Sequence, residues 1–341
     1  IDAQYWVQDV QNRVFSTLGQ PNWLAAYLSI LVPIAVGLGL TVFLSQTNIL
    51  FYTLYLILAT LYYLALLFTK SRSGFMGLWV GLVFFVGFYL WQKRQSKPLL
   101  ILNTKYLILF FVLIGGITFV VGSPFEQLNK FTFEGLRHRF SQLTTNDQRL
   151  TTGLPALETG LPADATALQA GGTESGEIRK IVWQGAIDIA RAYPLFGSGV
   201  ETFAYSYYKF KPIAHNLTSE WDFLYNKAHN EYLNYAATTG FVGLGSYLFM
   251  IGAFLFMVFK RLKSNILVFA LLAGYLSILV SNFFGFSVVL VNLYFFLIPA
   301  FVFILNGQLK SQPAFAFSLP KHIQENRQFR SGLIVVLLVA S

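Results

Sequence analysis

Long runs of residues without charge constrain the fold of this chain more than any other feature of its sequence. A run of about 20 apolar residues is long enough to cross a bilayer as a helix. The chain is 55% hydrophobic and 11% charged, whereas soluble domains average about a quarter charged. We expect seven complete membrane spans, at residues 23–44, 48–69, 75–92, 106–122, 240–259, 266–282 and 286–305. The predicted fold class is therefore an all-α polytopic membrane protein, a helical bundle.

Both ends of the chain resemble internal parts of a longer membrane protein. The chain begins at Ile1 within a polar stretch, without a methionine. It ends at Ser341 inside an apolar run, 332–341, that is too short to cross a membrane. We therefore expect a piece of a larger polytopic protein, with 332–341 as the start of a truncated transmembrane helix.

Basic residues cluster in three links between the predicted spans, and all three links would lie on one side of the membrane. An excess of Lys and Arg marks the cytoplasmic side of membrane proteins. The basic residues of these links are Lys93, Arg94, Lys97, Lys105, Lys260, Arg261, Lys263, Lys310, Lys321, Arg327 and Arg330. This topology accounts for most of the net charge of +9, so we expect no nucleic-acid partner.

The opposite, extracytoplasmic side carries one large segment, at about 123–239. It holds 12 of the 15 acidic residues, and its Thr-, Gly- and Pro-rich part, 144–176, is typical of a surface loop. The expected organisation is a periplasmic segment (1–22), four transmembrane helices (23–122), a large, partly helical periplasmic loop (123–239), three transmembrane helices (240–305), a cytoplasmic link (306–331) and the truncated helix (332–341).

Several kinds of chemistry lose support because their residue patterns are missing from the sequence. The chain has no cysteine, so it has no disulfide, thiolate ligand or cysteine nucleophile. It contains no GxxxxGK[ST], HExxH or DxD motif, which disfavours nucleotide hydrolysis, zinc hydrolysis and metal-dependent use of nucleotide sugars. No charged residue falls in the middle of a predicted span, which disfavours an ion-coupled transporter.

Lys70 and Arg72 lie in the link between the second and third predicted spans, on the extracytoplasmic side. The positive-inside bias does not call for basic residues there. Two interpretations stay open. The side chains can be interface anchors that reach lipid headgroups, or they can form an anion site at the outer surface of the membrane.

The segment 174–194 has the pattern of an amphipathic helix that ends at Pro194. Arg191 falls on its polar side, where a solvated charge is expected. Arg179 lies about 120° away, on the apolar side, with Trp183 one turn further on to stack against the guanidinium. An arginine on an apolar side needs an anionic partner or a wet cavity, so Arg179 is the stronger candidate for a functional site.

The segment 227–249 has the pattern of a helix that runs into a membrane span. His229, Leu233 and Ala236 would share one of its stripes. A lone histidine on an apolar stripe is more often a hydrogen-bonded core residue than a catalyst. Its ordinary pKa of about 6.5 nevertheless suits a general base at neutral pH.

These motifs occur in an order that resembles the bacterial O-antigen ligase and O-antigen polymerase family. The most specific match is His229-Asn230, followed after nine residues by Gly240-Phe-Val-Gly243, as in the ligase pattern H-[NSQ]-x9-G-x2-[GTY]. The remaining matches are "TLGQPNWLAAYL" at 17–28, "SRSG" at 71–74, "IRKIVW" at 178–183 and "YPLFGSGVETF" at 193–203. In the first of these, Gln20 replaces a more usual Asn. The resemblance covers nearly the whole chain.

The resemblance implies a multi-pass glycosyltransferase of the bacterial inner membrane, active on the periplasmic face. Its donor would be a glycan on a polyprenyl (undecaprenyl) diphosphate in the lipid bilayer, transferred with inversion and without nucleotide sugar, metal or cofactor. Arg72 and Arg179 match the arginines thought to hold the diphosphate, and His229 matches the histidine that helps to activate the acceptor. We expect Lys70, Trp183 and Asn230 to contact the substrate as well.

The acceptor separates the alternatives within this family. A ligase uses a lipid core, a polymerase uses a glycan, and a protein O-oligosaccharyltransferase uses Ser or Thr. The H-N-x9-G-x2-G match favours a ligase. Outside this enzyme class, a glycan or lipid transporter and a scaffold with an extracytoplasmic binding domain stay open. A scaffold predicts that Arg72, Arg179 and His229 can be replaced together without loss of function.

Overall fold

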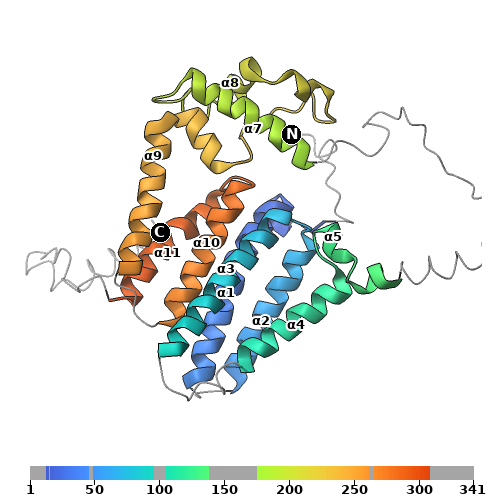
Figure 1. Cartoon of the computed structure of the whole chain (residues 1–341), viewed down its shortest axis with the longest axis vertical. Coiled ribbons are helices and arrows are strands. Elements are labelled where there is room, and N and C mark those ends of the chain that lie inside the picture. Colours follow the sequence, from blue (N-terminus) through green and yellow to red (C-terminus); the bar gives the residue numbers. More distant parts are fainter. Residues whose placement is uncertain are drawn as a thin grey trace, which may run out of the picture. The chain divides into compact units, whose positions relative to one another are not determined.

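The structure is a computed structural model that describes residues 13–14, 16–45, 49–95, 105–137, 175–260 and 265–307. Within these residues every regular element is a helix (Figure 1). The chain divides into two compact units, Ile1–Asn306 and Gly307–Ser341. All helices described below belong to the first unit. Most of the surface loop expected at 144–176, most of the link 306–331 and the truncated helix 332–341 lie outside the described residues, and residues 175–176 of that loop belong to a helix instead.

All seven predicted apolar helices are present, within a few residues of the expected bounds except at the start of α9. They are α1 Pro21–Ser45, α2 Ile49–Phe68, α3 Arg72–Gln95, α4 Lys105–Val121, α9 Glu231–Lys260, α10 Ile266–Phe283 and α11 Val289–Leu305. Among the described residues, five of them (α1, α2, α3, α9 and α10) are long and apolar enough to cross a membrane. The other two have 17 residues each, or about 26 Å of helix against a hydrocarbon core of about 30 Å. The all-α membrane fold is therefore confirmed, whereas the number of seven spans stays a prediction.

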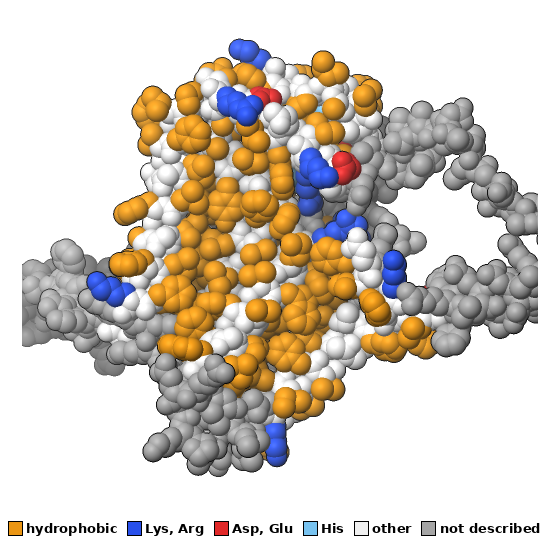
Figure 2. Space-filling view, in the orientation of Figure 1, with side chains coloured by type: hydrophobic (Ala, Val, Ile, Leu, Met, Phe, Trp, Pro, Cys, Tyr) orange, Lys and Arg blue, Asp and Glu red, His pale blue; other side chains and the backbone are white. Residues whose placement is uncertain are grey.

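The helical bundle is held together by apolar packing around α1, which contacts α2, α3 and α10. α1 and α3 approach closely where Gly74, in the "SRSG" motif, faces Ala25. A Cβ on Gly74 would lie 2.5 Å from the Ala25 Cβ, so only glycine permits this approach. Large hydrophobic side chains cover much of the outer face of the bundle (Figure 2). An apolar surface of this extent is expected where a protein contacts lipid.

A second group of helices packs on the first part of α9. It comprises α7 Ser175–Ala192, α8 Phe203–Phe210 and the 3-10 helix η4 Ile213–Leu217, and Figure 1 shows α7 and α8 across one end of α9. The buried side chains of this group are Ile178, Val182, Ala186, Ile189, Phe203, Tyr207, Tyr225, Ala228 and Ala237. The predicted amphipathic helix 174–194 is thus confirmed as α7, which ends before Pro194 because proline cannot continue it.

The expected continuous helix through 227–249 is wrong at two points. His229 precedes α9 and is not part of its helical stripe. Within α9, Gly240 interrupts the helix with φ 66° and ψ −169°. The chain after α7 fills this interruption, because the amide of Phe241 donates to the Pro194 carbonyl (2.8 Å) and that of Val242 donates to the Leu195 carbonyl (3.2 Å). These long-range hydrogen bonds replace those that the helix loses.

Replacing Gly240 with alanine is expected to destabilise the folded protein by about 3 kcal/mol. The backbone conformation is essentially restricted to glycine, and a Cβ would lie 2.4 Å from the Leu195 carbonyl. The measurement is the thermal unfolding of the purified chain. Gly245→Ala is the matched control in the same helix, since a Cβ at Gly245 meets no heavy atom within 4 Å. Equal melting temperatures for the two variants would contradict this account of Gly240.

Candidate active site

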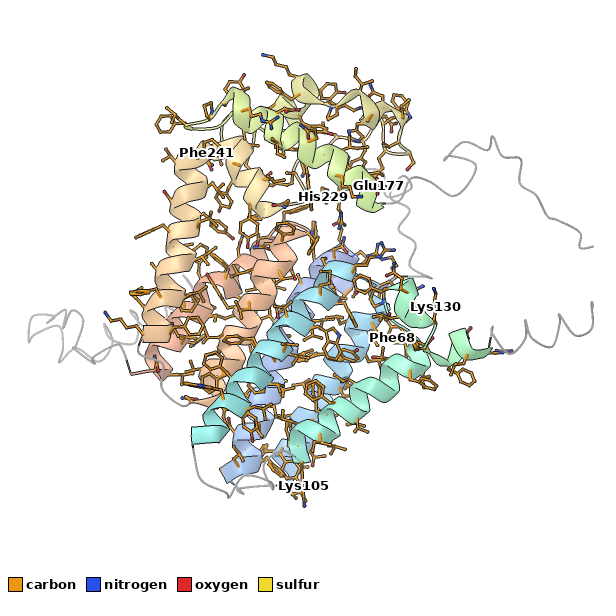
Figure 3. All side chains as sticks on the ribbon, viewed as in Figure 1. Phe68, Lys105, Lys130, Glu177, His229 and Phe241 are labelled. Carbon is orange, nitrogen blue, oxygen red and sulfur yellow. The ribbon has the colours of Figure 1, made fainter. Side chains whose placement is uncertain are left out.

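A cavity of about 1810 Å³ lies where the start of α1, the start of α7, the segment 220–239 and the start of α11 meet. Its lining includes Arg179 and His229, the two residues that the sequence favoured most. Figure 3 places His229 between α7 and the bundle, and Lys105 at the opposite end of the bundle helices. The cavity therefore lies at the end of the bundle away from the basic residue Lys105.

The backbone of His229 has an unusual conformation that its neighbours maintain. Its φ is 52°, in the left-handed region that costs a non-glycine residue about 1–3 kcal/mol. The indole N–H of Trp183 donates to the His229 carbonyl (3.4 Å). The next residue, Asn230, is buried and its side chain accepts from the amide of Leu233 (3.0 Å), which caps α9. Strain of this kind at a cavity wall is typical of a functional residue.

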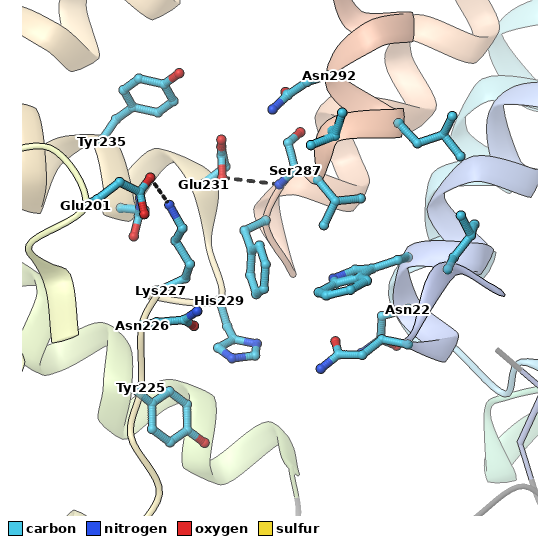
Figure 4. Close-up of a pocket in the computed structure, with 18 of the residues that line it drawn as sticks. Asn22, Glu201, Tyr225, Asn226, Lys227, His229, Glu231, Tyr235, Ser287 and Asn292 are labelled. Atoms are coloured by element: carbon cyan, nitrogen blue, oxygen red, sulfur yellow. Dashed lines mark hydrogen bonds and ion pairs between the residues drawn. The ribbon is translucent and has the colours of Figure 1, made fainter. Parts of the chain in front are cut away.

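The imidazole of His229 lies between two aromatic rings and points into the cavity. Its ring centroid is 5.4 Å from that of Tyr225 and 5.2 Å from that of Phe286. Figure 4 shows it facing Asn22 across the cavity. Burial, and then the charge of Arg179, lower the pKa of His229 to about 4. The imidazole is therefore neutral at pH 7 and has a nitrogen lone pair that can accept a proton.

Arg179 is half-buried and belongs to a group of arginines with Arg13 and Arg72. Burial lowers the pKa of Arg179 most. The charges of Arg13 and Arg72 lower it further, whereas the interactions with Tyr225 and with the Glu220 carboxylate oppose the shift. The hydroxyl of Tyr225 donates to the Glu220 carboxylate. Like charges that lower one another's pKa are stabilised by an anion among them, so this part of the cavity suits a bound anion.

Arg13 lines the cavity and was not recognised from the sequence as a site residue. Its Nε donates to the Thr69 carbonyl (2.9 Å) and its Nη2 to Oδ1 of Asn22 (3.2 Å). The same Oδ1 accepts from the Ser71 hydroxyl (2.9 Å). These hydrogen bonds connect Arg13 to the start of α1 and to the link before α3. The available signal was a basic residue outside the expected cytoplasmic links, the same signal that drew attention to Arg72.

The other predicted site residues lie around the cavity but do not line it. Arg72 is the first residue of α3 and is exposed, yet its positive charge lowers the pKa of Arg179. Lys70 is exposed in the preceding link. The expected stack of Trp183 on Arg179 is wrong: among the described residues, Trp183 contacts the His229 carbonyl and the Phe283 ring (5.7 Å) instead. The capping role of Asn230 likewise directs its side chain to the backbone of α9.

The described part of the chain has no group of three or more His, Cys, Asp or Glu side chains that could hold a metal ion. The positive charge in the cavity wall comes from arginine and lysine side chains. An anionic group bound beside His229 would therefore contact guanidinium groups, which form forked hydrogen bonds to phosphate oxygens.

Comparison with known proteins shows which family the chain resembles. Residues 54–248 match the family model described as O-antigen ligase. The match covers more than half of the chain, from within α2 to within α9, and includes Arg72, Arg179 and His229. No curated protein and no solved structure matches the chain.

Proposed function

Because the chain belongs to the O-antigen ligase family, we propose that it transfers a glycan from a polyprenyl diphosphate to an acceptor hydroxyl. One observation carries this proposal. A neutral imidazole, that of His229, lies in the same cavity wall as Arg179, whose charge acts directly on it. A general base beside an anion site is what this transfer requires, since the nucleophile must lose a proton while a diphosphate leaves.

In the proposed reaction, the acceptor oxygen attacks the anomeric carbon of the donor sugar. Its proton passes to the unprotonated ring nitrogen of His229, and the bond from the anomeric carbon to the diphosphate oxygen breaks. The leaving polyprenyl diphosphate gains one negative charge, which Arg179 and Arg13 stabilise, with Arg72 nearby. Attack from the side opposite to the diphosphate inverts the anomeric carbon. The guanidinium groups supply the positive charge, so the proposed reaction uses no metal or cofactor.

A lipid-attached donor agrees with the apolar wall of the same cavity. Val289, Leu293 and Phe296 of α11 line it, with exposed fractions of 88%, 52% and 61%. Such side chains suit contact with a prenyl chain or with lipid. The opposite positions of His229 and Lys105 (Figure 3) support an active face on the extracytoplasmic side of the bacterial inner membrane, because basic links mark the cytoplasmic side.

The test is a transfer assay with the intact chain in its native membranes, supplied with polyprenyl-diphosphate glycan and with three acceptors. The acceptors are a lipid-core glycolipid, a lipid-linked glycan and a Ser/Thr peptide. Product is followed by gel shift and mass, with and without a metal chelator. We expect product with one acceptor and the same yield with chelator. Donor binding without any covalent product would contradict the proposal and favour a transporter or a scaffold.

A further inference from the structure

We propose that the segment 193–200, between α7 and α8, inserts apolar side chains into the lipid bilayer, in the leaflet on the side of the cavity. This inference does not depend on the proposed transfer reaction, which assigns no role to the motif at 193–203. The segment carries no charge. Its side chains Leu195, Phe196 and Val200 are 62%, 74% and 73% exposed, and we call these three the apolar tip.

Backbone hydrogen bonds hold this segment on α9, so the exposure of the apolar tip is built into the fold. The pairs of amide donor and carbonyl acceptor are Ser198 with Ala237 (2.9 Å), Gly199 with Thr238 (2.9 Å), Phe241 with Pro194 (2.8 Å) and Val242 with Leu195 (3.2 Å). Gly197 has φ 69°, and a Cβ there would lie 2.2 Å from the backbone carbon of Thr238. A fixed surface that presents large apolar side chains indicates contact with lipid or with a partner.

The length of α9 places this segment at the boundary of the bilayer. The part of α9 from Phe241 to Lys260 has 20 residues, or about 30 Å of helix, which matches a hydrocarbon core of about 30 Å. The ammonium of Lys260 suits one boundary, where a long basic side chain reaches the headgroups. Phe241 then lies at the other boundary, at the end of α9 beside the chain that follows α7 (Figure 3). Leu195, which is bonded to the neighbouring Val242, lies at the same depth.

The surface next to the apolar tip identifies lipid as its partner. Along α9, Val242, Phe249 and Phe256 are 51%, 77% and 66% exposed. Residues seven apart lie on one face of a helix, because seven residues make nearly two turns. This face crosses the membrane, so lipid covers it, and the apolar tip continues it at the end near the cavity. Charged residues resume on either side of the tip, at Arg191 and Glu201, as expected where a segment leaves the apolar layer for the headgroups.

The test uses the absence of cysteine, which allows one nitroxide spin label to be attached at a chosen position of the intact chain. Phe196→Cys and Val200→Cys are labelled and reconstituted in vesicles of phosphatidylethanolamine and phosphatidylglycerol. Both side chains are exposed, so their replacement removes no core packing. The collision rate of each label with oxygen, which concentrates in lipid, is compared with its collision rate with a water-soluble nickel complex.

We expect the ratio of oxygen to nickel collisions at positions 196 and 200 to be several-fold higher than at Gln184→Cys, on the exposed polar side of α7. It should approach the ratio at Phe249→Cys, the lipid-facing control on α9. A ratio equal to that of the Gln184 variant would overturn the proposal, because the apolar tip would then lie in water. Few collisions with either reagent would also overturn it, because a second copy of the chain would then cover the tip. Neither measurement needs catalysis, so the result is separate from that of the transfer assay.

Discussion

Replacing His229 with alanine is expected to lower kcat for glycan transfer by about 10²–10⁴-fold, the usual contribution of a general base. Donor binding should persist, because the arginines that are proposed to hold the diphosphate remain. The measurements are initial rates of product formation and, separately, binding of the polyprenyl-diphosphate donor. A kcat within about threefold of wild type would remove His229 from the mechanism.

The pH dependence of the wild type provides a second check on His229. A base must be unprotonated to act, and burial beside Arg179 lowers the pKa of this imidazole to about 4. We therefore expect kcat/KM to stay constant down to about pH 5 and to fall only near pH 4. If His229 had the ordinary histidine pKa of about 6.5, kcat/KM would instead fall near pH 6.5. Each phosphorus of the donor diphosphate carries one ester and one anhydride link and keeps a single negative charge throughout this range. The ionisation of the donor therefore does not change the pH profile. A decline centred near pH 6.5 would contradict a buried, neutral base.

Replacing Arg179 with alanine is expected to lower kcat/KM by about 10²–10³-fold, as the loss of one charge-stabilising donor does in other enzymes. Unlike the His229 variant, it should also weaken donor binding. Arg179→Lys should recover only part of the activity, because an ammonium group cannot form the forked hydrogen bonds of a guanidinium. The same assays of product formation and donor binding measure both effects.

Arg191 is the matched control on the same helix. It lies at the last turn of α7, is 73% exposed and pairs with Asp188 at 3.1 Å. A surface ion pair of this kind contributes little to stability, so Arg191→Ala should retain transfer within about twofold. Full transfer by Arg179→Ala, or an equal loss in both variants, would show that α7 contributes no specific diphosphate contact.

The apolar helices and α7 were predictable from the sequence because the spacing of their hydrophobic residues indicates them. Apolar runs predicted the seven apolar helices, of which five are long enough to cross a membrane, and the amphipathic pattern predicted α7 with Arg179 on its apolar side. The sequence did not predict the interruption at Gly240. That conformation depends on amides of α9 bonding to Pro194 and Leu195, and local propensity carries no information about such distant partners.

The same limit applies to the candidate site. The residue types Arg179 and His229 could be selected from the sequence, and the cavity contains both of them. The left-handed backbone of His229 and the position of Trp183 under its carbonyl result from packing between α7 and the start of α9. Arg13 was missed because its contacts with Asn22 and the Thr69 carbonyl depend on tertiary packing, which no local sequence pattern indicates. The roles of these residues in transfer stay predictions.

The three arginines come from separate parts of the chain, and this affects the stability of the ligand-free protein. Arg13, Arg72 and Arg179 come from the N-terminal segment, the start of α3 and α7, and folding brings their like charges together at an electrostatic cost. A bound polyanion offsets that cost only in the folded state. By mass action, a ligand at a hundred times its Kd stabilises the folded form by about 2.7 kcal/mol. The ligand-free protein is thus the most heat-labile form, and its melting temperature serves as a gauge of site occupancy.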